Sequence, residues 1–343
     1  MRLRKSPAVG DYISMSNLTD RYNRHLNYLR ISVTDRCNLR CVYCLPRNFV
    51  SKLPHQDILT YEEILRIVRV AVPLGISKIR ITGGEPLVRK GICDFLYHLS
   101  EIKGLSDISI TTNGVFLKEN IKSIRSAGVK RINISLDTLN RKKFKEITGQ
   151  DCFDKVWESI LLAEEAGFDP VKINVVALRG INDDELADIA ALSFSHPFHI
   201  RFIEYMPIGK SAYQHSGTGM LAPEIIDRLS RLGKLLPVAN GVNDGPAERC
   251  RFEGAKGEIG LIRPLSHHFC YKCNRLRLTA SGQLRTCLLS DRQEDIKTPL
   301  RKGCSDSVLA DIFIKAVHLK PLEHKLTVSH SDEVSAQMSA IGG

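Results

Sequence analysis

The chain has 343 residues, of which 43% are hydrophobic, and a formal net charge of +11. This length is enough for one large α/β domain with a smaller appendage. No apolar run approaches the roughly 20 residues of a membrane-spanning helix, and no signal-peptide core follows the basic start at residues 1–5. We therefore expect a cytoplasmic protein without a membrane segment, whose ten cysteines are metal ligands or free thiols and not disulfides.

The positive charge is most simply a solvated basic surface without a specific partner. Nucleic acid is the alternative, but the basic residues form no long run, and aromatic residues, which would stack on bases, make up only 6%. We therefore expect no nucleic acid partner. A polyphosphate substrate would need only a few of these charges, provided that they point into one pocket.

From residue 28 to about residue 207, short β-rich runs alternate with amphipathic helical patterns. The predicted strands are Tyr28 to Val33, Lys78 to Thr82, Ile108 to Thr112, Arg131 to Leu136, Val171 to Leu178 and His199 to Tyr205. Helices are predicted between them, for example Tyr61 to Val72 and Phe153 to Ala166. Thr60 and Glu63 suggest a capping box before the first of these helices, and Gly167 ends the second.

The alternation of strands and helices predicts an α/β fold with a parallel sheet and right-handed crossovers. Six such units are too few for a closed eight-stranded barrel, so we predict an open, partial β/α barrel. Functional residues should then follow the C-terminal ends of the strands. Four polar or glycine-rich clusters occupy such positions: Gly83 to Glu85, Thr111 to Gly114, Ser135 to Asp137 and Glu204 to Pro207.

After Pro207 the pattern breaks into glycine-rich and polar stretches, which predicts a second, smaller domain. We assign residues 1–17 to an N-terminal extension, residues 18–210 to the partial barrel and residues 211–343 to a C-terminal domain. Gly209 to Met220 is expected to be a linker, and Asn240 to Lys256 an irregular loop. The C-terminal domain carries a second group of cysteines.

The first cysteine group consists of Cys37, Cys41 and Cys44, in the spacing Cys-x-x-x-Cys-x-x-Cys after the first predicted strand. Three thiolates suit three irons of a cubane [4Fe–4S] cluster and leave the fourth iron open to bind a substrate or cofactor. The alternative is a zinc site or three unrelated thiols, although structural zinc usually has four ligands arranged in pairs.

The second cysteine group consists of Cys270, Cys273 and, fourteen residues further on, Cys287. A second [4Fe–4S] cluster with an open iron would suit it. His267 and His268 lie just upstream, so a structural zinc site with three cysteines and one histidine is the alternative. The other cysteines have no ligand-like spacing and are expected to be free thiols: Cys93, Cys152, Cys250 and Cys304.

The first cysteine group, with Gly83-Gly84-Glu85-Pro86 at a later strand end, resembles the radical S-adenosylmethionine (SAM) enzymes. Other segments resemble more narrowly one family of lyases in molybdenum cofactor biosynthesis, the GTP 3′,8-cyclases. These segments are Cys-x-x-Cys-Asn-Arg-x-Arg-Leu-Thr from Cys270, Arg30 seven residues before Cys37, Arg201 to Pro207 and the terminal Gly342-Gly343. The resemblance extends from about Leu18 to Gly343.

The resemblance implies two [4Fe–4S] clusters and SAM as cofactors. SAM would chelate the open iron of the first cluster, and an electron would cleave it to methionine and a 5′-deoxyadenosyl radical. The implied SAM contacts are Tyr43, Gly83, Gly84, Glu85, Ser135 and Met206. Removal of the 3′ hydrogen of GTP, attack of C3′ on C8 and reduction would give 3′,8-cyclo-7,8-dihydro-GTP, in the first step of molybdenum cofactor biosynthesis.

A buried triphosphate requires fixed cations, and arginine suits phosphate best. Each basic residue on a strand could instead face solvent, but the resemblance assigns several of them to GTP. The implied contacts are Arg30, Arg80, Thr111, Lys172, Arg275, Leu276 and Arg277, with Lys78 and Arg201 as further candidates. The terminal Gly342-Gly343 would reach into the active site, although frayed termini are more common.

The implied partners are GTP, a cellular electron donor, a downstream enzyme that forms cyclic pyranopterin monophosphate, and a second copy of the chain in a homodimer. Two alternatives stay open. One is a radical SAM enzyme that modifies peptides, against which the segment Arg275-Leu276-Arg277 and the basic strands speak. The other is a non-catalytic metal-binding protein that binds nucleic acid or senses redox state.

Overall fold

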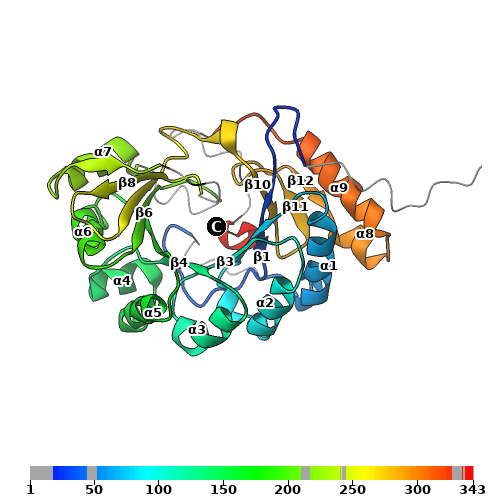
Figure 1. The fold of residues 1–343 in the computed structure, drawn as a ribbon, viewed down its shortest axis with the longest axis horizontal. Coiled ribbons are helices and arrows are strands. Elements are labelled where there is room, and N and C mark those ends of the chain that lie inside the picture. Colours follow the sequence, from blue (N-terminus) through cyan, green and yellow to red (C-terminus); the bar gives the residue numbers. More distant parts are fainter. Residues whose placement is uncertain are drawn as a thin grey trace, which may run out of the picture.

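The computed structural model describes residues 18–44, 52–209, 217–239, 241, 245–326, 334 and 337–342. The predicted N-terminal extension, residues 1–17, lies outside the described residues, as does part of the predicted linker, residues 210–216. Within the described residues the α/β class and the open, partial barrel are confirmed (Figure 1).

Six parallel strands form the centre of the sheet, in the order in which they occur in the chain. They are β1 (Tyr28–Ser32), β2 (Lys78–Thr82), β3 (Asp107–Thr112), β4 (Arg131–Ser135), β5 (Val171–Ala177) and β6 (His199–Glu204). The bounds of each strand agree with the prediction to within one residue. Parallel pairing of consecutive strands requires a crossover between them, which helices provide.

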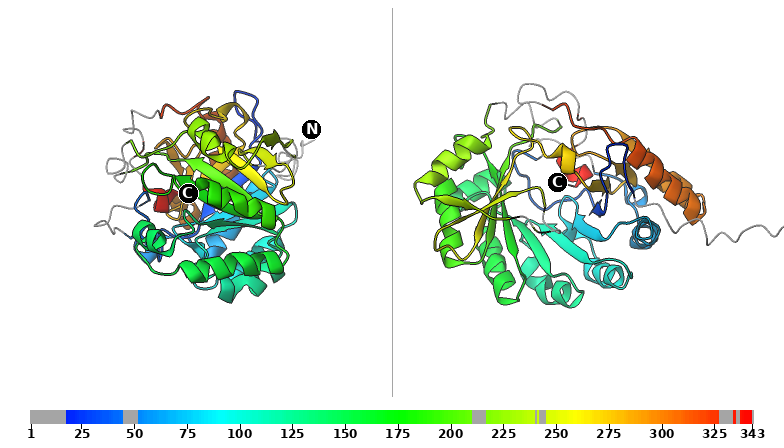
Figure 2. Two further views of the ribbon diagram at one scale, coloured as in Figure 1. Left: turned by 90° about the vertical axis from the view of Figure 1, so that its left-hand side faces the viewer. Right: turned by 45° about the horizontal axis from the view of Figure 1, so that its top comes forward.

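The crossover helices cover the outer face of the sheet (Figures 1 and 2). They are α1 (Tyr61–Ala71), α2 (Ile92–Ser100), α3 (Leu117–Ser126), α4 (Arg141–Thr148), α5 (Phe153–Glu165) and α6 (Leu186–Ser195). The predicted capping box is confirmed, because the Glu63 N–H donates to the Thr60 hydroxyl and the Thr60 N–H donates to the Glu63 carboxylate. The end of α5 is also as predicted, since Gly167 follows it with a φ of 73°.

The C-terminal part of the chain adds strands to both edges of this sheet. At one edge β9 (Glu258–Ile262) pairs in parallel with β6, and β8 (Glu248–Phe252) and β7 (Leu235–Pro237) follow outward. At the other edge β10 (Arg275–Leu278) pairs in parallel with β1, and β11 (Gln283–Arg285) and β12 (Gln293–Asp295) follow. The described residues thus form one 12-stranded sheet, which curves without closing because β7 and β12 stand at opposite ends (Figure 1).

The prediction of an irregular loop from Asn240 to Lys256 is wrong, because β8 occupies part of this segment. β8 is rich in charged residues, so its sequence has no alternating hydrophobic pattern. These residues form ion pairs with β9 and with the residue that follows β9. Arg249 pairs with Glu258 at 2.7 Å, and Glu248 pairs with Arg263 at 2.8 Å. Pairing with a distant segment, and not local pattern, therefore defines this strand.

The C-terminal part also contains α7 (Ala222–Ser230), α8 (Lys297–Arg301), α9 (Asp306–His318) and α10 (Met338–Ile341). The last of these lies inside the curve of the sheet, beside β1 (Figures 1 and 2). In the predicted linker, Gly219 forms a bridge with Leu178 and Met220 is buried, so its described end packs into the fold. A search of the described residues for a helix long and apolar enough to cross a membrane found none.

The two faces of the central strands differ in chemistry. On β1, Leu29 and Ile31 belong to the core under the helices, whereas Arg30 lines a cavity on the inner face. On β2, Ile79 likewise belongs to the core and Arg80 lines the cavity. Parallel strands are usually apolar on both faces, so the charged inner face indicates a ligand site.

Glu258 of β9 is a buried carboxylate that forms ion pairs with two arginines of the neighbouring strand β8. Its carboxylate is 4% exposed and accepts from Arg249 Nε at 2.7 Å and from Arg251 Nη2 at 2.9 Å. Burial raises the pKa of Glu258, but the hydrogen bonds and charges of Arg249 and Arg251 outweigh it, so the pKa is lowered. Ionised Glu258 therefore stabilises the fold.

We predict that Glu258→Gln lowers the free energy of unfolding by about 2 kcal/mol at pH 7, because two arginines lose their carboxylate partner. The loss should be absent in Glu253→Gln, an exposed control in the same hairpin. The stabilisation by the wild-type carboxylate is present above its unfolded pKa and is lost as pH falls through its lower folded pKa. Urea unfolding measures both effects, and equal stability of the two variants would contradict the prediction.

Candidate active site

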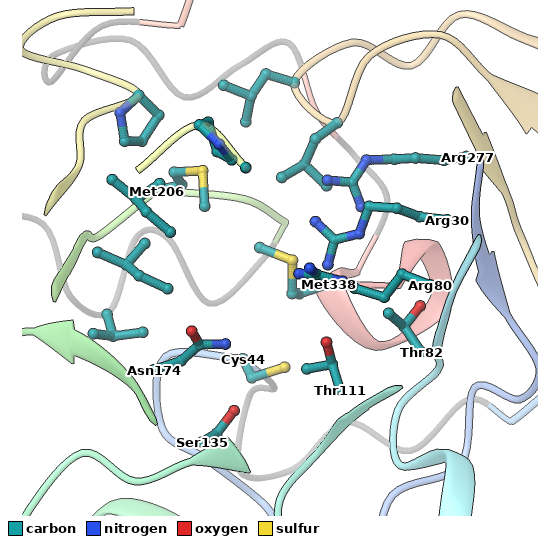
Figure 3. Close-up of a pocket in the computed structure, with 18 of the residues that line it drawn as sticks. Arg30, Cys44, Arg80, Thr82, Thr111, Ser135, Asn174, Met206, Arg277 and Met338 are labelled. Atoms are coloured by element: carbon teal, nitrogen blue, oxygen red, sulfur yellow. The ribbon is translucent and has the colours of Figure 1, made fainter. Parts of the chain in front are cut away.

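Both cysteine groups line one cavity on the inner face of the sheet. None of the ten cysteines, all of which the structure describes, forms a disulfide, and the six predicted metal ligands are among the residues that line this cavity. The other predicted residues that line it are Arg30, Tyr43, Arg80, Gly83, Gly84, Glu85, Thr111, Ser135, Arg201, Met206, Arg275 and Arg277. Figure 3 shows that Arg277, Arg30 and Arg80 point into the cavity from one side and Asn174, Ser135 and Thr111 from another. One cavity therefore contains most of the predicted site.

The loop with the first cysteine group is held against the end of β2. The Gly84 N–H donates to Thr34 O at 2.7 Å, and the Glu85 N–H donates to Arg36 O at 2.8 Å. A Cβ atom on Gly84 would lie 2.5 Å from Arg36 O, and one on Gly83 would lie 2.8 Å from Thr34 O. Packing of this loop is thus a reason for the two glycines, in addition to the predicted SAM contact.

Glu85 fixes the end of β3 from a buried position. Its carboxylate accepts from Thr112 Oγ1 at 2.8 Å and from the Asn113 N–H at 2.6 Å. Burial raises the pKa of Glu85 to about 7, although these hydrogen bonds oppose the rise. The Asn113 side-chain amide in turn lies 3.7 Å from Cys37 Sγ. Glu85 therefore positions a polar group beside the first cysteine group.

Tyr43 is held by Asp137, which the sequence analysis named only as part of the cluster Ser135 to Asp137 and not as a site residue. Its hydroxyl donates to Asp137 Oδ2 at 2.6 Å, and Asp137 Oδ1 accepts from the Val176 N–H at 2.8 Å. Burial raises the pKa of the Cys37 thiol to about 11 and that of Cys44 to about 12. Binding of a metal ion would replace the protons of these thiols, because the positive charge of the metal stabilises the thiolates.

The second cysteine group has a different electrostatic environment. Burial would raise the pKa of Cys273, but the positive charges of Lys320 and Arg275 and hydrogen bonds outweigh it and lower the pKa to about 7. Lys320 is 2% exposed and donates to Arg275 O at 3.2 Å and to Thr286 O. The sequence pattern did not identify this lysine, because it follows α9 far from the cysteines in the chain.

Arg24 is a second buried cation that the sequence did not reveal. It forms an ion pair with Asp20 at 2.6 Å and donates through Nη1 to Cys270 O at 2.7 Å and to Leu322 O at 2.8 Å. Nη2 also donates to Pro321 O at 2.6 Å. All the donors of this guanidinium are thus engaged, and they join three distant segments around the second cysteine group.

The two histidines upstream of Cys270 differ in position. His268 lines the cavity and its ring centroid lies 5.4 Å from that of His324, whereas His267 is not among the lining residues. His324 Nε2 is 3.0 Å from Pro264 O. Burial, together with the charge of His268, lowers the pKa of His324, so neutral imidazole is favoured there.

Three arginines on adjacent strands lie side by side. The register places Arg30 opposite Arg277 of β10 on one side and opposite Arg80 of β2 on the other. Burial and the charges of Arg277 and Arg80 lower the pKa of Arg30, and burial with the charge of Arg275 lowers the pKa of Arg277 to about 10. Buried cations that repel one another in this way favour a bound polyanion.

Three of the predicted substrate contacts do not line the cavity. Leu276 is fully buried in the apolar core, because its neighbours Arg275 and Arg277 occupy the inward positions of β10. Lys172 is buried and follows the same alternation as Asn174 of β5, so it faces inward below the cavity. Lys78 forms an ion pair with Asp107 at 3.3 Å.

Several residues on the cavity wall carry a buried polar atom without a hydrogen-bond partner among the described residues. Two of these atoms are Thr111 Oγ1, on a residue that was predicted, and Asn174 Oδ1, on one that was not. A ligand would satisfy both atoms. The signal for Asn174 was present in the sequence, since a polar residue two positions after Lys172 interrupts an otherwise apolar strand.

Gly342 lies inside the barrel, as expected, while Gly343 lies outside the described residues. The Gly342 carbonyl accepts from Arg277 Nη1, and its φ is 73°. A Cβ atom at this position would lie 2.5 Å from Thr82 Oγ1 and 3.2 Å from Ser32 Cβ. Only glycine fits here, because both the backbone conformation and the neighbouring strands exclude a side chain.

Two family profiles match successive parts of the chain. Radical SAM superfamily matches residues 31–193, which include the first cysteine group. Molybdenum Cofactor Synthesis C matches residues 198–326, which include the second.

Curated proteins match over nearly the full chain. The GTP 3′,8-cyclase of Moorella thermoacetica is 50% identical over 327 residues, which cover 95% of this chain and 100% of that protein. This chain belongs to the GTP 3′,8-cyclase family. The proteins of the same name from Pelotomaculum thermopropionicum and Geobacter sulfurreducens are 48% and 46% identical, cover 95% of this chain and are themselves covered to 100% and 99%.

Solved structures agree with the fold. SuiB of Streptococcus suis bound to S-adenosylmethionine has a TM-score of 0.59 and 17% identity, covering 85% of this chain and 69% of SuiB. SuiB bound to precursor peptide SuiA gives a TM-score of 0.60 at the same identity, with 85% and 66% covered. At this identity the likeness extends to the fold alone.

The residues present fit the clusters that this family implies. Each cysteine group offers three thiols at one wall of the same cavity. In a cubane each thiolate binds a different iron, so the three sulfurs need not converge on one point. Among the described residues, no group of three or more His, Cys, Asp or Glu side chains could hold a single metal ion.

We predict that Gly84→Ala prevents loading of the first cysteine group, since the added Cβ would push the loop away from β2. About four iron atoms per chain should be lost after anaerobic reconstitution, while the second group keeps its iron. Gly245→Ala is the matched control, because a Cβ there meets no atom within 4 Å. Full iron content in Gly84→Ala would refute the steric argument.

Proposed function

We propose that this chain is a radical SAM GTP 3′,8-cyclase that converts GTP to 3′,8-cyclo-7,8-dihydro-GTP in molybdenum cofactor biosynthesis. The observation that carries the proposal is the meeting of two cysteine groups and a row of arginines in one cavity. Family membership supplies the reaction type, and the arginine row supports a polyphosphate substrate.

Cys37, Cys41 and Cys44 would hold one [4Fe–4S] cluster, and Cys270, Cys273 and Cys287 the other. When bound, the first cluster supplies the electron that cleaves SAM, and the second offers an open iron to the substrate. The buried thiols of the first group suit this role, because burial keeps water away from a reactive radical.

The SAM contacts would come from the wall beside the first cysteine group. Tyr43, fixed by Asp137, and the glycines at the end of β2 border that loop. Ser135 is the last residue of β4 and Met206 follows β6, and both line the same cavity. Glu85 would act on SAM through the backbone it holds, since its carboxylate is already engaged.

The triphosphate of GTP would bind to the arginines that line the inner face. Arg30, Arg80 and Arg277 form one row. Arg275 is on the same strand as Arg277, and Arg201 of β6 lines the same cavity. Lys172 and Lys78, below the cavity, would lower the electrostatic cost of the same negative charge without contact. Thr111 and Asn174 would donate or accept hydrogen bonds to the nucleoside through their unsatisfied atoms.

The protein's task in this reaction is positioning. The 3′ hydrogen of the ribose must face the SAM side of the cavity, and C8 of the guanine must lie close to C3′. The arginine row at one wall and the second cysteine group beside it would fix the two ends of GTP and so set this distance. No general acid or base is needed for the ring closure, in contrast to hydrolytic sites.

Several finer assignments belong to the same proposal. We infer residues 18–210 as the barrel unit, residues 211–343 as the unit with the second cluster, and a homodimer as the assembly. A cellular electron donor would supply the clusters, and a downstream enzyme would convert the product to cyclic pyranopterin monophosphate. Ten unpaired cysteines favour the reducing cytoplasm as the location.

Anaerobic incubation with SAM, dithionite and GTP tests the reaction. We expect 5′-deoxyadenosine and the cyclised nucleotide in equal amounts, both dependent on GTP, and about eight iron atoms per chain. GTP-independent 5′-deoxyadenosine without cyclised nucleotide would refute the proposal. Tightly bound zinc in the second cysteine group would refute the two-cluster assignment.

We predict that Arg277→Ala keeps both clusters but lowers GTP turnover by at least about 100-fold, because it removes an arginine at the end of the row that also donates to the Gly342 carbonyl. Iron content and rate are measured on the same sample. Arg231→Ala, an exposed arginine on α7's end, is the matched control. Wild-type turnover in Arg277→Ala would mean that the arginine row does not bind the substrate.

A further inference from the structure

Lys320 is a buried cation whose contacts all lead to the second cysteine group. It follows α9 and is 2% exposed. Its Nζ donates to Thr286 O and, at 3.2 Å, to Arg275 O, and its positive charge helps to lower the pKa of the Cys273 thiol. The two carbonyl groups accept from two of the three N–H donors of the ammonium group.

The positions of these acceptors connect two cysteine-bearing segments. Thr286 immediately precedes Cys287, and Arg275 follows Cys273 by two residues, so one ammonium group bridges the end of β11 and the start of β10. The Cys270 end of the first segment is held by Arg24, which donates to Cys270 O and also to Pro321 O beside Lys320. Lys320 therefore lies at the junction of the whole second group.

The charge of Lys320 has no carboxylate partner among the described residues, whose ion pairs do not include it. Burying an ammonium group without a counter-charge is costly, and two carbonyl groups offset only part of that cost. The two carbonyl groups belong to the segments that carry Cys273 and Cys287, so thiolates of the second group would supply negative charge close to Nζ. A [4Fe–4S]²⁺ core with three thiolates carries a net charge of about −1, which becomes about −2 on reduction.

We propose that Lys320 is the built-in counter-charge of the second cluster: it joins the two ligand segments and raises the cluster's reduction potential. This inference rests on the proposed function, which assigns a cluster to Cys270, Cys273 and Cys287. The redox change concerned is the uptake of one electron by the cluster, in which no bond forms or breaks. The ammonium group stabilises the reduced form more than the oxidised form, because the reduced form carries more negative charge.

Two substitutions separate charge from hydrogen bonding. Lys320→Gln removes the charge but keeps a donor for the two carbonyl groups, whereas Lys320→Met removes both. Lys315→Met is the matched control, since Lys315 is on α9 and its side chain is 64% exposed. All three are made in the full chain, in the wild-type background and in a Cys37→Ala, Cys41→Ala, Cys44→Ala background that retains only the second group.

The readouts are iron content and a dithionite redox titration followed by electron paramagnetic resonance. We expect Lys320→Gln to keep its iron and to shift the second cluster's potential to a more negative value. Lys320→Met should show the same negative shift together with partial loss of iron. The potential of the first cluster, and all values for Lys315→Met, should match the wild type.

An unchanged potential of the second cluster in iron-loaded Lys320→Gln would overturn the proposal. Loss of the second cluster in Lys320→Met but not in Lys320→Gln, with the first cluster intact, would support the joining of the two segments by hydrogen bonds. Failure of the underlying cofactor assignment would look different, because the unmodified protein would then bind only about four iron atoms per chain.

Discussion

Repulsion among the arginines of the cavity wall is the constraint on which this candidate active site depends. Arg277, Arg30 and Arg80 occupy matching positions on three adjacent strands, which are spaced by about 4.8 Å in a sheet. Two like charges about 5 Å apart repel by roughly 3 kcal/mol at an effective dielectric constant of about 20. The outward faces of the same strands must offset this cost by burying aliphatic side chains under the helices. A bound polyanion offsets this repulsion. The inner face of the sheet therefore favours a phosphorylated substrate over a neutral one.

The two cysteine groups lie in one cavity but are assembled by different means. The first is a short continuous loop, which glycines and main-chain hydrogen bonds hold against the end of β2. The second comes from separated segments, which Arg24 and Lys320 bring together through main-chain carbonyls. Their electrostatics differ accordingly, since burial raises the pKa of Cys44 to about 12, whereas cations lower that of Cys273 to about 7. Two clusters at these positions would therefore experience different local fields.

Local pattern predicted the six central strands and the cysteine motifs because each is encoded within a few consecutive residues. It failed for β8, whose charged residues find their partners only on the neighbouring strand. It also missed Arg24, Lys320 and Asn174, because their roles arise from contacts between distant segments or from an unsatisfied atom. Leu276 shows a different limit of local pattern. The motif covers three consecutive residues, but a strand presents only alternate side chains to one face, and the Leu276 side chain lies in the apolar core.

The parallel pairing of β1 with β10 has a consequence for how the protein is made. β1 leaves the ribosome early, yet its neighbour on one side belongs to a segment synthesised after all six central strands. Until then Arg30 has no Arg277 beside it, and the loop with the first cysteine group, which follows β1, lies at an unpaired edge of the sheet. Long-range pairing of this kind forms slowly. Nascent chains should thus depend on chaperones that cover this edge, and iron delivery should follow release of the chain.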